Sequence, residues 1–208
     1  MKETVSPLSS LPEAALDVPF DRAAVLGALG TRSVVLVGMM GAGKSSIGRR
    51  LAGELGLAFV DADLEIEKAA GMTIPEIFES QGEDYFRSGE ARVIARLLDC
   101  GPQVLATGGG AFMNPRTREL VREKGISIWL KADADILLRR VKRRTDRPLL
   151  KTGDPAATLA RLLAERDPVY AEADLVIQSR DEPHEIIMSE IIAALAGKLG
   201  VAANGVLS

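Results

Sequence analysis

The sequence has few of the features on which secreted, membrane-bound or nucleic-acid-binding proteins depend. Cys100 is the only cysteine in 208 residues, so no internal disulfide can form, which is compatible with a reducing cytosol. No apolar run approaches the roughly 20 residues that span a bilayer, and residues 1–20 lack the basic start and long apolar stretch of a secretory signal. The net charge of −3 gives no overall attraction to nucleic acid or an anionic membrane. We therefore expect a cytoplasmic protein with no nucleic-acid or membrane partner.

What is present is a globular composition, 47% hydrophobic and 26% charged, with a regular alternation of segments. Strands are expected at 33–38, 57–63, 103–110, 126–130 and 174–178, and helices at 44–56, 64–71, 73–80, 83–101, 115–124, 134–142, 155–166 and 185–199. Such alternation implies right-handed crossovers and a parallel sheet covered on both faces. The sequence thus predicts one three-layer α/β domain over 31–200, a flexible extension over 1–30 and a tail over 201–208.

Residues 38–45, GMMGAGKS, fit the phosphate-binding pattern G-x-x-x-x-G-K-[ST] between an expected strand and an expected helix. Glycines let the backbone curl so that its amides face phosphate oxygens, Lys44 can bridge the outer phosphates, and the Ser45 hydroxyl can ligate Mg²⁺. The residues expected to contact the nucleotide are Gly41, Ala42, Gly43, Lys44, Ser45 and Ser46. A plain glycine turn is the alternative, and the complete pattern in its proper context argues against it. We expect ATP or GTP to bind here.

Two carboxylates, Asp61 and Asp63, stand where the second strand is expected to end. Ligands bind at the carboxyl ends of strands in open α/β sheets. One acid there can help to position Mg²⁺ and its water, and the other can accept a proton from an acceptor hydroxyl. Capping of the next helix is the structural alternative for either residue, and their spacing leaves both readings open.

Two further segments suit an anionic acceptor. Arg87 lies on an expected helix, where its guanidinium can bind a carboxylate through two hydrogen bonds, although most helix arginines are only solvated. Glu83 and Glu90 are its candidate neutralising neighbours. The triplet Gly108, Gly109 and Gly110 ends an expected strand, and it allows either close approach of a ligand or a plain loop.

The segment 139–147 holds six basic residues and one acid. A nucleic-acid patch, a solvated helix face and a mobile arginine-bearing lid over the phosphates are the three readings. Pro148, Gly153 and Pro155 break the helical pattern and favour the lid. Arg166 is followed closely by Pro168, which is expected to end the helix, and is either a second anion contact or a partner for the helix dipole. Cys100 and His184 receive no role.

Taken in order, the segments GMMGAGKSS, FVDADLEIE, IPEIF, FRSGE, ATGGGAF, RPLL and ERDPVY resemble the shikimate kinase family over residues 33–178. The resemblance implies a P-loop fold like that of nucleoside monophosphate kinases, with a five-stranded parallel sheet and a mobile lid. It also implies a monomer that transfers the γ-phosphate of ATP, with Mg²⁺, to the 3-hydroxyl of shikimate on the route to chorismate and the aromatic amino acids.

The resemblance also assigns roles to individual residues. Lys44 and Ser45 serve ATP and Mg²⁺, Asp61 lies near the metal, and Asp63 binds the acceptor hydroxyl as candidate base. Arg87 and Arg166 hold the shikimate carboxylate, and the backbone of Gly108, Gly109 and Gly110 closes the pocket. Arg147 is the lid arginine facing the transferred phosphate, and Arg140 is the preferred arginine for adenine. Low aromatic content, 4%, suits an adenine site of arginine and aliphatic groups.

Two alternative functions are compatible with a P-loop. Another small-molecule P-loop kinase, acting on gluconate or a nucleoside monophosphate, would leave Arg87 and Arg166 without a joint purpose. A non-catalytic nucleotide-binding regulatory domain would be expected to carry a substitution at Lys44, Asp63 or Arg147, and none is present.

Overall fold

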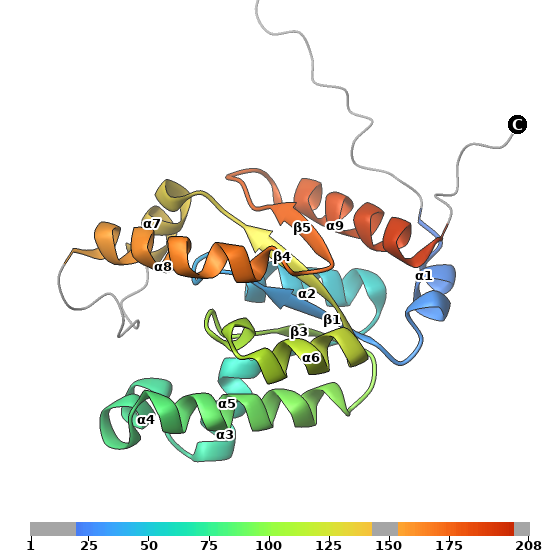
Figure 1. The fold of residues 1–208 in the computed structure, drawn as a ribbon. Helices are drawn as coiled ribbons and strands as arrows, with labels where there is room; N and C mark the ends of the chain where they lie inside the picture. Colours follow the sequence, from blue (N-terminus) through green and yellow to red (C-terminus); the bar gives the residue numbers. More distant parts are fainter. Residues whose placement is uncertain (1–19, 143–153, 202–208) are drawn as a thin grey trace, which may run out of the picture.

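The computed structural model describes residues 20–142 and 154–201, and Figure 1 shows a central sheet with helices on both of its faces. Within these residues the sheet has five parallel strands in the order β2-β3-β1-β4-β5. The strands are β1 (Ser33–Val37), β2 (Ala58–Asp61), β3 (Gln103–Ala106), β4 (Gly125–Lys131) and β5 (Leu175–Gln178). The predicted three-layer α/β fold with a five-stranded parallel sheet is confirmed.

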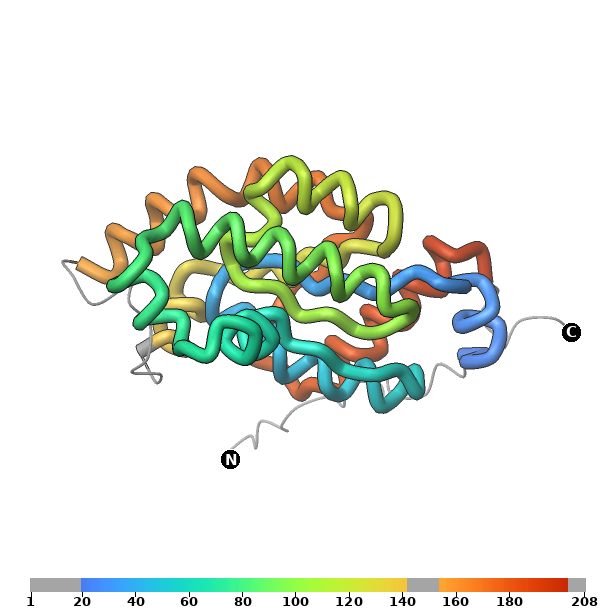
Figure 2. Tube along the Cα trace, turned by 90° about the horizontal axis from the view of Figure 1, so that it is seen from below, coloured from blue at the N-terminus to red at the C-terminus, as the bar shows by residue number. Residues whose placement is uncertain are grey.

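The helices form the two outer layers. They are α1 (Arg22–Leu29), α2 (Lys44–Leu55), α3 (Ala62–Ala70), α4 (Ile74–Gln81), α5 (Glu83–Leu98), the short 3₁₀ helix η2 (Ala111–Met113), α6 (Pro115–Lys124), α7 (Ala134–Lys142), α8 (Pro155–Tyr170) and α9 (His184–Leu199). Helices α2 and α9 pack together on one face of the sheet, and α5 and α6 pack together on the other. Figure 2, seen from below, shows the sheet between these two layers. No helix in the described part of the chain is long and apolar enough to cross a membrane.

The core forms where β-branched strands meet the apolar faces of helices. Strand β1 is buried along its whole length, as expected for the central strand of a parallel sheet covered on both faces. On α2, Ile47, Leu51 and Leu55 lie at helical spacing and are at most 2% exposed. The helix ends at Gly56, whose φ of 65° lies in the left-handed region that favours glycine.

The N-terminal part of the domain begins earlier than the sequence suggests. Residues 22–29, expected within a flexible extension over 1–30, form α1, which packs against α9. The side chain of Asp21 caps this helix, and Val25 and Leu29 are at most 1% exposed. The expectation of a flexible segment is therefore wrong for residues 22–29, because an N-cap and an apolar pair one turn apart suffice to dock one short helix. Residues 1–19 and 202–208 lie outside the described part.

The parallel topology brings distant segments to one edge of the sheet. The glycine-rich loop follows β1, Asp61 ends β2, Gly108 follows β3, and Ser179 follows β5. These positions are all at the carboxyl ends of the strands, where open α/β sheets bind ligands. Figures 1 and 2 both show α4 and α7 toward this end of the molecule and α1 at the opposite end.

Candidate active site

The loop between β1 and α2 has the backbone of a phosphate cradle. Gly38, Gly41 and Gly43 have φ values of 128°, 84° and 96°, which residues with side chains rarely adopt. In the described part of the chain no side chain caps the N-terminus of α2, so its first amides face the loop without a side-chain acceptor. The ammonium group of Lys44 donates to the carbonyl oxygens of Gly38 and Met39 at 2.7 and 3.0 Å, which holds it over the cradle. This arrangement suits an anion with several phosphates.

Ser45 and Asp61 meet beside the cradle. The hydroxyl of Ser45 donates to Oδ2 of Asp61 at 2.6 Å. The other carboxylate oxygen of Asp61 accepts from the backbone N–H of Asp63 at 3.1 Å and so caps α3. The capping alternative is therefore confirmed for Asp61, and it coexists with the predicted position beside the P-loop, because one carboxylate has two oxygens. Asp63 lies in the first turn of α3 rather than on the strand.

The donor set at this point fits Mg²⁺. A hydroxyl and a carboxylate are the hard oxygen ligands that this cation prefers, and it commonly completes its shell with phosphate oxygens and water. Within the described ranges no group of three or more His, Cys, Asp or Glu side chains gathers in a way that could hold a metal alone. Ser45 and Asp61 are therefore suited to a metal that arrives with a nucleotide.

A large cavity, about 790 Å³ in volume, opens next to these residues. Its lining combines the predicted acceptor groups with apolar side chains, and includes Asp61, Asp63, Phe78, Phe86, Arg87, Glu90, Gly108, Gly109, Gly110 and Arg166. These residues span more than 100 positions of the sequence, and the fold brings them together around one cavity. Arginines and carboxylates around one cavity suit a small acceptor with both an acid group and hydroxyls.

Arg87 is held in place by two carboxylates of its own helix. Its Nη1 donates to Glu90 at 2.7 Å, and its Nη2 lies 3.1 Å from Glu83. Burial opposes the charge on Arg87, and the attraction of Glu90 and Glu83 outweighs it, so the pKa of the guanidinium is raised. The two neighbours proposed from the sequence are thus confirmed, and Arg87 remains a cation at the cavity wall.

Glu90 is itself a component of the site, although the sequence predicts it only as a charge partner of Arg87. Its side chain is 3% exposed, and its second carboxylate oxygen, Oε1, is buried without a hydrogen-bond partner in the described part of the chain. Burial raises the pKa of the Glu90 carboxyl, Arg87 lowers it in part, and the charge of Asp63 raises it further. Its position three residues after Arg87 on an amphipathic helix was the available signal.

The three glycines after β3 allow this crowding. A Cβ at Gly108 would lie 2.7 Å from Glu90 Oε1 and 2.8 Å from Asp63 Oδ1. A Cβ at Gly110 would lie 2.5 Å from Nη1 of Arg87. Real Cβ atoms do not approach so closely, so these positions are glycine because charged side chains pass over the backbone. The reading of the triplet as a close-approach segment is favoured over a plain loop.

Arg166 reaches the same wall from α8. It is 9% exposed, and its Nη1 donates to the carbonyl of Gly109 at 3.1 Å. The expected helix stop after Arg166 is wrong, since α8 continues through Pro168 to Tyr170. Tyr170 is fully buried against Trp129 and donates its hydroxyl to the Gly109 carbonyl, and this packing extends the helix past the proline. Burial raises the pKa of Tyr170 to about 12.

A second cavity, about 400 Å³, borders the P-loop. Lys44, Ser45, Arg140, Ser179, Arg180 and His184 are among its lining residues. Arg140 is anchored there, because its guanidinium donates to Ser179 Oγ at 2.9 Å and to the Arg180 carbonyl at 2.8 Å. Met40, Ser45, Ser46, Asp61, Asp63 and Gly109 line both cavities. The two cavities therefore meet at the predicted metal and base positions, which is where a group can pass between two ligands.

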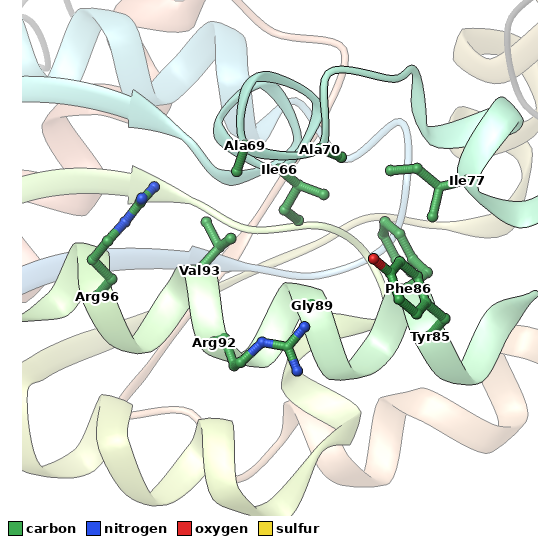
Figure 3. Close-up of a pocket in the computed structure, with 10 residues that line it drawn as sticks. All are labelled: Ile66, Ala69, Ala70, Ile77, Tyr85, Phe86, Gly89, Arg92, Val93 and Arg96. Atoms are coloured by element: carbon green, nitrogen blue, oxygen red, sulfur yellow. The ribbon is translucent and has the colours of Figure 1, made fainter. Parts of the chain in front are cut away.

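A third cavity, about 290 Å³, lies on the opposite side of α5 from Arg87. Figure 3 shows Ile66, Val93 and Phe86 beside this cavity, and Arg92 and Arg96 extending from α5. It contains none of the predicted site residues, so α5 presents Arg87 and Glu90 to one cavity and Arg92 to another. Arg147 and the expected lid lie outside the described residues.

Comparison with known proteins agrees with this geometry. The family model described as shikimate kinase matches residues 40–196. A shikimate kinase of Rhodopseudomonas palustris is 65% identical over 195 residues, covering 94% of this chain and 93% of that protein. The solved structure of shikimate kinase from Acinetobacter baumannii in complex with shikimate superposes with a TM-score of 0.78 at 39% identity, covering 80% of this chain and 94% of that chain.

A more distant structure shows the extent of the fold. A gluconokinase from Sinorhizobium meliloti shares 22% identity with a TM-score of 0.56, covering 80% of this chain and 93% of that chain, a likeness that shows the fold alone. The family model and the high identity over nearly the whole chain are more specific than this shared architecture. The chain belongs to the shikimate kinase family.

Proposed function

We propose that this protein transfers the γ-phosphoryl group of ATP to the 3-hydroxyl of shikimate, giving shikimate 3-phosphate and ADP. The observation that carries the proposal is the meeting of two cavities at Ser45, Asp61 and Asp63, one beside the phosphate cradle and one lined by Arg87 and Arg166. Shikimate is a small polyhydroxylated carboxylate, so it needs a cation for its acid and a carboxylate for its hydroxyls. The cavity lined by the two arginines offers both.

The nucleotide side of the reaction rests on charge and position. The cradle amides and Lys44 bind the phosphates, and Arg140, fixed by Ser179, borders the space for the nucleoside. Ser45 and Asp61 would hold Mg²⁺, which when bound neutralises charge on the phosphates. Arg147 is proposed to face the transferred group.

The acceptor side rests on Asp63 and the two arginines. Arg87 and Arg166 orient the substrate carboxylate, which fixes the ring between them and α3. Asp63 then accepts a hydrogen bond from the 3-hydroxyl and aligns its oxygen with the γ-phosphate, removing the proton as the new P–O bond forms. Gly108, Gly109 and Gly110 limit the depth of the pocket and add no side chain that would displace the ring.

A coupled ADP-release assay with MgATP tests the proposal by comparing shikimate, gluconate, AMP and CMP as acceptors. ADP formation that requires shikimate, with little from the other three, is the expected result. Turnover with gluconate or a nucleotide but not shikimate would overturn the acceptor assignment and leave the nucleotide site standing. We further propose a cytoplasmic monomer, and light scattering coupled to size exclusion tests the oligomeric state.

A further inference from the structure

The chain contains a single histidine, His184, and the fold places it beside the phosphate cradle. It begins α9 and is half-buried. Its Nε2 lies 3.1 Å from Oγ of Ser46, although 138 residues separate the two in sequence. Since α2 and α9 pack against each other, the contact joins the starts of two helices at the edge of the nucleotide cavity.

The hydrogen bonds around Ser46 limit how this contact can be made. Nη1 of Arg50 donates to Ser46 Oγ at 2.9 Å, and an arginine can only donate. The hydroxyl therefore uses a lone pair toward Arg50 and has one proton of its own, which it can give to Nε2 of His184. If a phosphate oxygen accepts this hydrogen bond from Ser46 instead, Ser46 can keep its hydrogen bond to His184 only when Nε2 carries a proton and donates it.

The groups around His184 suit a phosphate anion. The charged residues that line the same cavity are Lys44, Asp61, Asp63, Arg140, Arg180 and Glu182, and Arg50 is bonded to Ser46. Arg180 pairs with Glu182 and Glu190. An imidazole with a proton on Nε2, in its neutral or its charged form, donates a hydrogen bond toward Ser46 or a phosphate oxygen.

We propose that His184 is a nucleotide-binding residue, which holds Ser46 and supplies a proton donor when a phosphate group occupies the start of α2. The inference rests on the proposed nucleotide site and adds to it a residue from the far end of the chain. Removal of this donor should therefore weaken ADP binding and leave shikimate binding unchanged.

The first test uses the fact that a tag-free preparation gives imidazole NMR signals from one residue only. Saturating ADP at pH 6.0 should shift these signals, whereas shikimate alone should leave them nearly unchanged. Unmoved signals in a protein that binds ADP normally would overturn this inference and leave the proposed function intact. Failure of the unaltered protein to bind ADP would overturn both.

The second test measures the ADP dissociation constant by calorimetry at pH 7.5. His184→Ala removes the donor, and His184→Gln keeps an amide donor near the Nε2 position. His184→Ala should weaken ADP binding about threefold to tenfold, and His184→Gln should recover most of that loss. Glu54→Gln, at an exposed position in the last turn of α2, is the matched control and should leave the ADP affinity unchanged. Equal ADP affinity in the unaltered protein and His184→Ala would contradict the proposal.

Discussion

Replacement of Arg87 by glutamine should raise the KM for shikimate far more than the KM for ATP. The change removes a cation that is held at the acceptor cavity by Glu83 and Glu90 at 3.1 and 2.7 Å. It also leaves the Glu90 carboxylate, 3% exposed, without its cation and facing the substrate's acid group. The nucleotide cavity is lined by other residues, so ATP binding should be spared.

The size of the effect follows from the hydrogen bonds that the substitution removes. Hydrogen bonds to charged groups contribute about 1.5 to 3 kcal/mol each, and glutamine offers only a neutral amide in place of the charged guanidinium. A net weakening of shikimate binding by about 2 to 3 kcal/mol corresponds to a rise in shikimate KM of about 30- to 150-fold. Steady-state kinetics of coupled ADP release, with each substrate varied in turn, measures both KM values.

Two further variants separate binding from folding. Arg92→Gln is the matched control, because Arg92 lies on the same helix but beside the cavity of Figure 3, and it should leave both KM values within about twofold. Arg87→Gln combined with Glu90→Gln removes the unpaired buried carboxylate, so it should recover thermal stability without recovering shikimate KM. A shikimate KM within about threefold of the unaltered protein in folded Arg87→Gln would refute the reasoning.

Three more predictions follow from the same cavity. Asp63→Asn should lower kcat by about 100-fold or more with little change in either KM, because general-base contributions are of that size, and pre-steady-state ADP formation would check it. Gly108→Ala should weaken shikimate binding as measured by calorimetry, since its Cβ would meet Glu90 and Asp63 within 2.8 Å; unchanged affinity would show that these carboxylates move freely. The pKa of Glu90 is raised above its ordinary value of 4.5, so its contribution to stability is present below that pH and is lost as the pH rises through the folded-state pKa. In thermal unfolding from pH 4 to 8, the stability of Glu90→Gln should therefore rise relative to that of the unaltered protein as the pH rises. A constant difference in stability between the two proteins would contradict this.

Some expectations could be made from local sequence because the interactions themselves are local. The phosphate cradle needs glycines and a following helix within eight residues, and the chain supplies both. Thr73 and Glu76 form a capping box, with each side chain bonded to the other's backbone, and their spacing of three residues is a local sequence signal for it. Arg87 and Glu90 pair because residues three apart on a helix are neighbours.

Other features required long-range packing. The extension of α8 past Pro168 depends on burial of Tyr170 against Trp129, and no local rule places that tryptophan there. Docking of α1 depends on α9, which lies more than 150 residues later. The contact between His184 and Ser46 shows the same limit, because the two residues come from opposite ends of the domain's sequence.

The sequence by itself determined the fold class, the phosphate cradle and the chemical types of the acceptor residues, since hydrophobic periodicity and short motifs are read over one or two turns of chain. Only the tertiary structure decided that Asp61 serves both Ser45 and a helix cap, that Glu90 is buried beside Asp63, and that two cavities share one wall. The physical reason is the parallel sheet, whose crossovers return each strand end to one edge and so create contacts that no segment contains alone.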